Sequence, residues 1–186
     1  MIAVIPISGF TESNRLPIGM RRLWQDELRP RSSAKVFIHP PVRWKHDCRD
    51  LVGTLEEINA SRLIIIGYSW GVGYGATRLA KRALRAGIDV RLVLSCDGVY
   101  RPTWLPTWAN FLAVNALTRA RPIRFPGRVE AVAGVRQSGT LPAGHDILLR
   151  SQRVTLTKLE HETHSSIDDA PHWRAMVAQH LDKLLP

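Results

Sequence analysis

The apolar residues of this chain fall in short unbroken runs rather than in alternating patterns. Ile64–Ile66 forms one such run and Leu92–Leu94 another. A strand with one face in water alternates apolar and polar residues, whereas a strand covered on both faces is apolar throughout. The runs therefore predict a parallel sheet with helices on both sides.

Strand-like and helix-like segments alternate along the whole chain of 186 residues. The expected strands are Ile2–Ile7, Lys35–His39, Arg62–Ile66, Val90–Cys96, Val129–Val135 and Arg153–Leu159. Helices are expected over Leu16–Leu28, from an N-cap at Asp47 to Ile58, over Trp70–Ala86 with Gly87 as its stop, over Thr107–Leu117, and from about Ala170. This alternation predicts an α/β fold: a doubly wound, mostly parallel six-stranded sheet flanked by helices, in one domain spanning 1–186.

One stretch breaks the alternation. Residues 98–128 contain four prolines together with Trp104, Trp108 and Phe111. A long connection at the carboxyl edge of a parallel sheet is more often functional than idle. We expect a short lid-like insertion whose aromatic residues supply an apolar substrate pocket, the alternative being that they are local core.

The charge, the hydropathy and the cysteines limit the partners and the cellular compartment that we expect for this chain. The net charge is +10, but the cations are spread along the chain and no basic run is interleaved with stacking aromatics, so we expect no nucleic-acid partner. No apolar run is long enough to cross a membrane, so no stable membrane insertion is expected. Cys48 and Cys96 are expected as reduced, buried thiols, and the apolar start has no basic residue before it, which together favour the cytoplasm.

The strongest chemical signal is Gly67-Tyr68-Ser69-Trp70-Gly71. This G-x-S-x-G motif follows an expected buried strand and opens an expected helix. A serine at such a tight strand-to-helix turn needs small neighbours, because its backbone is strained and the helix packs close to the strand. We therefore expect Ser69 to be a nucleophile, whereas a glycine-rich turn with an incidental serine is the bland alternative.

A serine hydroxyl needs a base to act as a nucleophile. Where a G-x-S-x-G serine is followed along the chain by the acid and then by the histidine, the histidine should lie after the last strand. His161 and His164 both lie there, and we favour His164 because it stands deeper in the loop that leads to the closing helix. For the acid, Asp97 ends the fourth strand, whereas Asp146 lies well beyond the fifth in what resembles an exposed turn. We favour Asp97, since a carboxylate at a strand end can be buried and can orient the histidine.

An oxyanion hole requires two backbone N–H groups. Trp70, directly after the nucleophile, is expected to supply one, and Gly9 or Phe10 in the loop after the first strand the other.

On these residues the chain resembles a compact α/β-hydrolase, similar to lipase-like and thioesterase-like members that lack the first one or two strands of the full fold. The resemblance implies a Ser-His-Asp triad, an acyl-enzyme intermediate, and no metal or organic cofactor. It departs from the family pattern in having no His-Gly-Gly motif after the first strand and in placing the acid one strand early.

The expected function is hydrolysis of carboxylic esters or thioesters, with a small-molecule acyl substrate. The alternative from another class is a noncatalytic binding protein that kept the fold, and amide or carbon–carbon bond cleavage stays open because fold does not fix reaction. The sequence leaves the acyl chain, the leaving group and the oligomeric state undetermined.

Overall fold

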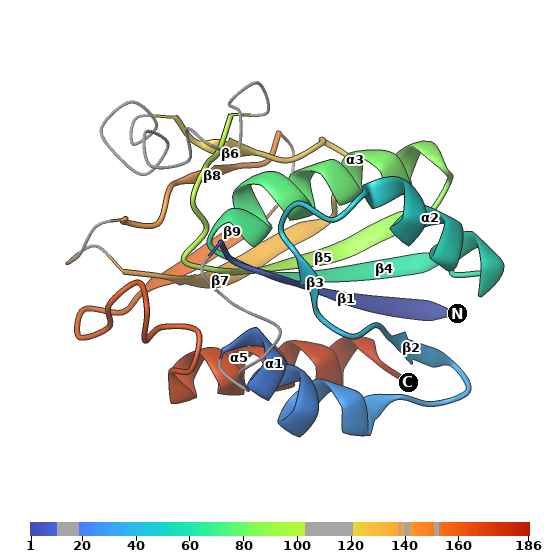
Figure 1. Ribbon diagram of the computed structural model, residues 1–186, viewed down its shortest axis with the longest axis horizontal. Helices are drawn as coiled ribbons and strands as arrows, with labels where there is room; N and C mark the ends of the chain where they lie inside the picture. The colour runs from blue at the N-terminus through green and yellow to red at the C-terminus, as the bar shows by residue number, and fades with distance from the viewer. Residues whose placement is uncertain (11–18, 103–120, 138, 140–141, 151–152) are drawn as a thin grey trace.

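A parallel sheet of seven strands forms the centre of the computed structural model, which describes residues 1–186 except 11–18, 103–120, 138, 140–141 and 151–152 (Figure 1). The strand order is β2-β1-β4-β5-β7-β9. The short strand β3 also pairs with β1, and every pairing in the sheet is parallel. The strands are β1 (Ile2–Ser8), β2 (Val36–Ile38), β3 (Val42–Arg43), β4 (Arg62–Tyr68), β5 (Asp89–Cys96), β7 (Ala131–Arg136) and β9 (Arg153–Lys158). The predicted fold class is confirmed.

Three short strands were not predicted. Besides β3, the strands β6 (Ile123–Arg124) and β8 (Ile147–Leu148) pair in a small parallel sheet of their own. Each of the three has two residues, which is too short for any periodicity to show in a sequence.

Helices cover both faces of the main sheet (Figure 1). One layer holds α2 (Cys48–Glu57), the π-helical η3 (Gly71–Ala76) and α3 (Thr77–Arg85). The other holds α1 (Met20–Leu23), which continues as η1 (Trp24–Leu28) and η2 (Arg29–Arg31), together with α5 (Pro171–Leu184). None of the described helices is both long and apolar enough to cross a membrane.

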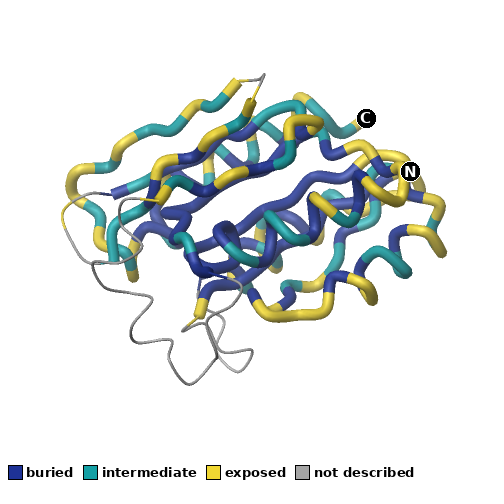
Figure 2. The backbone as a smooth tube through the Cα atoms, turned by 90° about the horizontal axis from the view of Figure 1, so that it is seen from above, coloured by how far each residue is buried: buried dark blue, intermediate teal, exposed yellow. Residues whose placement is uncertain are grey.

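The sheet separates two apolar cores, and β4 contributes to both. Leu63 and Ile65 pack in the core beneath α2 and α3, whereas Ile64 and Ile66 pack in the core beneath α1 and α5. The strands of the sheet accordingly form the buried centre of the molecule in Figure 2. Burying each such side chain stabilises the fold by about 1.5–3 kcal/mol. This two-sided burial explains the unbroken apolar run in the sequence.

The helix boundaries follow from local chemistry. The carboxylate of Asp47 accepts a hydrogen bond from the Arg49 N–H at 2.9 Å, which confirms the predicted N-cap of α2. That N–H lowers the pKa of Asp47, with a further contribution from the charge of Arg49. Gly87 adopts φ of 81° just after α3, the left-handed conformation that ends helices.

Two expectations fall on residues outside the described part of the chain. The predicted helix over Thr107–Leu117 lies wholly there. The organisation as one domain with a lid-like insertion at about 98–128 stays a prediction, because residues 103–120 belong to the undescribed ranges.

Candidate active site

The carboxyl ends of β4 and β5 lie side by side and carry two of the predicted site residues. Ser69 follows Tyr68, the last residue of β4, and Asp97 follows Cys96, the last residue of β5. Tyr68 and Cys96 are partners in the parallel register, so the two polar residues emerge next to each other at one edge of the sheet. The Ser69 N–H donates to the Cys96 carbonyl at 3.0 Å.

The turn at Ser69 has the geometry that its small neighbours make possible. Ser69 adopts φ of 53°, a left-handed conformation that is costly for a residue with a side chain. A Cβ on Gly71 would overlap the carbonyl oxygens of Ile7 and Ser8, and one on Gly67 would lie 3.0 Å from the Val72 nitrogen. The helix can therefore begin against β1 and β4 only because both positions are glycine.

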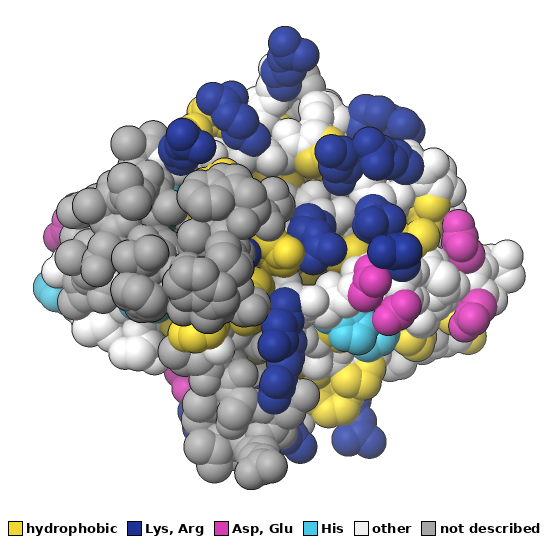
Figure 3. All heavy atoms as spheres, turned by 45° about the horizontal axis from the view of Figure 1, so that its top comes forward, with side chains coloured by type: hydrophobic (Ala, Val, Ile, Leu, Met, Phe, Trp, Pro, Cys, Tyr) yellow, Lys and Arg dark blue, Asp and Glu magenta, His cyan; other side chains and the backbone are white. Residues whose placement is uncertain are grey.

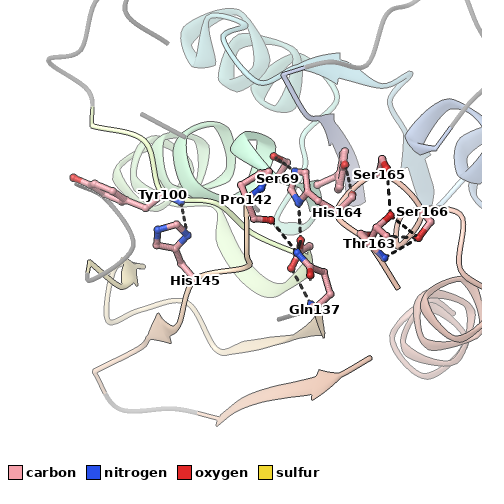
Figure 4. Close-up of polar contacts among 11 residues, drawn as sticks. Ser69, Tyr100, Gln137, Pro142, His145, Thr163, His164, Ser165 and Ser166 are labelled. Carbon is pink, nitrogen blue, oxygen red and sulfur yellow. Dashed lines mark hydrogen bonds and ion pairs between the residues drawn. The ribbon is translucent and has the colours of Figure 1, made fainter. Parts of the chain in front are cut away.

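His164 reaches this edge from the segment after β9. Its Nε2 lies 2.9 Å from the Ser69 Oγ (Figure 4). Its Nδ1 lies 2.6 Å from the Asp97 Oδ2. A carboxylate that accepts from the Nδ1–H leaves the lone pair of Nε2 facing the serine hydroxyl. Ser69, His164 and Asp97 thus form one continuous chain of hydrogen bonds.

Asp97 is fully buried, and its carboxylate is held on both oxygens. The Gln137 backbone N–H donates to Oδ1 at 3.0 Å, and the Gln137 side-chain amide donates to Oδ2 at 3.1 Å. The same amide nitrogen also donates to the Pro142 carbonyl at 2.9 Å. A buried carboxylate is costly unless its oxygens are satisfied, and these contacts meet that need.

The alternative acid and the alternative base lie apart from this chain of hydrogen bonds. Asp146 is 75% exposed and forms an ion pair with Arg136. His161 is exposed. Of the two carboxylates considered from the sequence, the structure therefore brings Asp97 to His164.

The two loops expected to supply oxyanion donors both lie against the nucleophile. A Cβ on Gly9 would lie 3.1 Å from the Ser69 Cβ, so the loop after β1 runs directly beside the serine. The Phe10 ring packs on the Trp70 ring, with 4.5 Å between centroids. Within the described residues, the Trp70 N–H donates to no acceptor, which leaves it available beside Ser69.

An aromatic cluster with a buried arginine supports Trp70 from behind. Trp44 packs edge-on against both Trp70 and Tyr74. The Arg101 guanidinium lies over these three rings at 4.9 to 5.6 Å, and burial lowers the pKa of Arg101. Sequence reasoning missed Arg101, Trp44 and Gln137. Nothing in the local sequence around an arginine, a tryptophan or a glutamine marks that residue as part of a site formed by distant segments of the chain.

The substrate pocket predicted from the sequence rests on three aromatic residues. Trp104, Trp108 and Phe111 lie outside the described residues. In the described ranges, no group of three or more His, Cys, Asp or Glu side chains is arranged to hold a metal ion.

Comparison with known proteins supports the architecture. No family model and no curated protein sequence matches the chain. Among solved structures it is similar to RedJ, the thioesterase of the prodiginine biosynthetic pathway in Streptomyces coelicolor, with 11% identity, a TM-score of 0.58, and 98% of this chain and 85% of that chain covered. A second RedJ structure has a polyethylene glycol (PEG) molecule bound in its active site and matches with 11% identity, a TM-score of 0.55 and coverage of 98% and 92%.

The thioesterase domain of Vlm2, solved with a bound dodecadepsipeptide, matches with 13% identity, a TM-score of 0.51 and coverage of 99% and 93%. At such low identity these likenesses establish the fold.

Proposed function

We propose that this chain, which has the α/β-hydrolase fold, is a serine hydrolase that cleaves carboxylic-ester or thioester bonds through an acyl-enzyme intermediate. The observation that carries the proposal is the hydrogen-bonded chain from the Ser69 Oγ through His164 to the buried Asp97 carboxylate. The proposed triad shares its chain order, serine then acid then histidine, with other enzymes of this fold.

The mechanism follows from the roles that the geometry allows. His164 Nε2 takes the proton as the Ser69 Oγ attacks the acyl carbonyl, and the proton then passes to the departing alcohol or thiol. Asp97 holds the Nδ1–H and stabilises the imidazolium that forms. Water activated by the same imidazole then releases the acid and restores Ser69.

The oxyanion of the tetrahedral intermediate would be held by backbone N–H groups on both sides of the serine. The Trp70 N–H is one proposed donor, and the Gly9 or Phe10 N–H is the other. Packing of the Phe10 ring on the Trp70 ring ties the two loops together. This contact supports a fixed spacing between the donors.

The proposed substrates are acyl esters and thioesters. The similar solved structures include two thioesterases, which favours thioesters among the acyl donors to be tested. The aromatic residues Trp104, Trp108 and Phe111 remain our proposal for an apolar acyl pocket. Cys48 and Cys96 are buried thiols, which is consistent with a reducing compartment, and we propose the cytoplasm as the place of action.

Reaction with a fluorophosphonate probe tests the proposal. The parent protein should be labelled covalently, and the Ser69→Ala and His164→Ala variants should not be, since the first lacks the nucleophile and the second its base. Ser95→Ala is a matched control, because Ser95 is a buried serine on the neighbouring strand that lies outside the triad. An unlabelled but folded parent would contradict the proposal and favour a noncatalytic binding protein.

A further inference from the structure

A group of five cations covers the outer side of α3 and the loop beside it. We call this group the basic face; its members are Arg78, Lys81, Arg82, Arg85 and Arg128. Figure 3 shows Lys and Arg side chains gathered over this side of the molecule, with Asp and Glu at its border. The sequence explains the imbalance, because the stretch from Ile58 to Val129 holds eleven Lys and Arg but only two carboxylates, Asp89 and Asp97.

The members of the basic face are close neighbours. Arg82 and Arg85 line one surface hollow together with Arg49 of α2, and Arg85 lines a second with Lys81 and Arg128. On α3 the four cations stand three and four residues apart, so they form two parallel rows on one side of the helix. Their like charges repel one another in the absence of a counter-charge.

Three arginines of the opposite layer are ion-paired, unlike the cations of the basic face. On the opposite layer, Arg22 pairs with Asp169, Arg31 with Asp182, and Arg174 with Asp26. By contrast, within the described ranges no member of the basic face lies within ion-pair distance of a carboxylate. The undescribed ranges contain a single carboxylate residue, Glu12.

We propose that the basic face binds the acidic side of a helix in a partner protein. Carboxylates spaced four residues apart on such a helix would match the rows formed by Arg78 with Arg82 and by Lys81 with Arg85. The nine residues of α3 span about 13 Å, a length that suits one packed helix. Guanidinium groups bind carboxylates with two parallel hydrogen bonds, which adds specificity to the charge attraction.

The surroundings of the basic face disfavour a wide anionic surface. Glu56 of α2 lines the same hollow as Arg82 and Arg85, and Asp50 is exposed on that helix. A membrane or a DNA duplex laid across α2 and α3 would press phosphates against both carboxylates, whereas a helix lying along the rows of α3 covers a narrower strip. The exposed large apolar residues of the described part are Met1, Phe10 and Leu148, so the basic face offers none for insertion into lipid.

Within the described residues, this side of the molecule also offers no exposed aromatic ring on which a base could stack. Tyr74, the aromatic residue next to the basic face, is covered by the Arg78 guanidinium at 4.7 Å from its ring centroid. Binding of single-stranded nucleic acid depends on exposed aromatic rings. An acidic helix needs only the charges that the face presents.

Fluorescence anisotropy with three probes tests the proposal. The first is a labelled helical peptide with glutamates four residues apart along one side, and its glutamine counterpart serves as the blank. The others are a labelled DNA duplex and labelled vesicles of phosphatidylglycerol in phosphatidylcholine. We expect the parent to bind the acidic peptide most tightly, and Arg78→Glu with Arg82→Glu to weaken that binding by at least about tenfold.

A matched control separates the basic face from net charge. Lys35→Glu with Arg62→Glu removes the same charge from exposed cations beside the chain ends, and should change peptide affinity by less than about twofold. Arg78→Gln with Arg82→Gln, which adds no new charge, should also weaken binding. Ser69→Ala should bind the acidic peptide as tightly as the parent does. Peptide binding and hydrolase activity are therefore tested independently.

Three results would overturn the proposal. One is equal weakening in the two double glutamate variants, which would reduce the effect to net charge. Another is tighter binding of the vesicles or the duplex than of the acidic peptide. The third is no peptide binding by the folded parent.

Discussion

The Tyr68 hydroxyl donates a hydrogen bond to the backbone carbonyl of His164 at 2.5 Å, while the two rings stack with 5.2 Å between their centroids. Tyr68 is the residue before the proposed nucleophile, and His164 is the proposed base, 96 positions further along the chain. One side chain therefore fixes both the backbone and the ring of the histidine relative to the serine turn. These contacts are with His164, so we regard Tyr68 as a positioning residue.

Tyr68→Phe should lower kcat by about three- to tenfold with little change in KM, because it removes one hydrogen bond worth about 1 kcal/mol and keeps the stacked ring. Steady-state kinetics on a p-nitrophenyl ester provide the measurement. In a His164→Ala background the same substitution should have no further effect on the residual rate. An equal loss in both backgrounds would show that Tyr68 acts on stability and not through the histidine.

Asp97→Asn should lower kcat by at least about a hundredfold on p-nitrophenyl esters, because an amide cannot hold the Nδ1–H tautomer or stabilise the imidazolium. Asp146→Asn is the matched control and should change kcat less than about twofold, since it breaks only an exposed ion pair with Arg136. The reverse order of effects would transfer the acid role to Asp146.

Gly71→Ala should destabilise the protein by about 2–3 kcal/mol, because the added methyl group would overlap the backbone of β1. Gly53→Ala is its counterpart. Gly53 lies within α2 with no atom near its would-be Cβ, so alanine there should stabilise by about 0.5–1 kcal/mol. Urea unfolding of both variants tests the pair, and a shift of the same sign in both would contradict the packing described at the serine turn.

His180 on α5 should make the fold less stable at mildly acidic pH. Partial burial, aided by the charge of Lys183, lowers the pKa of His180 below its ordinary value of 6.5. The folded state therefore resists protonation more than the unfolded chain does. The stability that this confers is complete above that ordinary value and is lost as the pH falls through the lowered pKa.

The free energy of unfolding should thus drop less for His180→Gln than for the parent between about pH 7.5 and about pH 5.5. His172→Gln, at an exposed position on the same helix, serves as the control and should follow the parent. Parallel curves for the parent and His180→Gln would show that the partly buried imidazole has no part in the acid response.

The main sheet could be predicted because its signal lies within single strands. Each residue of the Ile64–Ile66 run meets one of two cores, and no sequence-distant information is needed to see that the strand is covered on both sides. The closeness of Ser69 and His164 could be anticipated for a similar reason, since motif and chain order place both at the carboxyl edge. The nearness of Asp97, rather than Asp146, to His164 could be anticipated from the strand end at Asp97 and the exposed turn expected around Asp146.

Gln137 shows where such reasoning stops. It follows β7, and it reaches Asp97 only because Cys96 and Val135 are partners in the register between β5 and β7. Register is a property of two strands packed together and not of either sequence alone. The contacts of Tyr68 with His164 and of Arg101 with the tryptophans arise in the same way, from segments that meet only in the folded chain.

The left-handed backbone at Ser69 and Asp97, with φ of 53° and 43°, has a consequence for how this protein can change. Each such conformation costs a side-chain-bearing residue about 1–2 kcal/mol that glycine would not incur. The most relaxed sequence for this corner therefore has neither a hydroxyl nor a carboxylate. Selection for thermal stability alone would therefore favour replacing both residues with glycine. If Ser69 and Asp97 were retained in a lineage selected for thermal stability, their retention would indicate that both residues are needed for function.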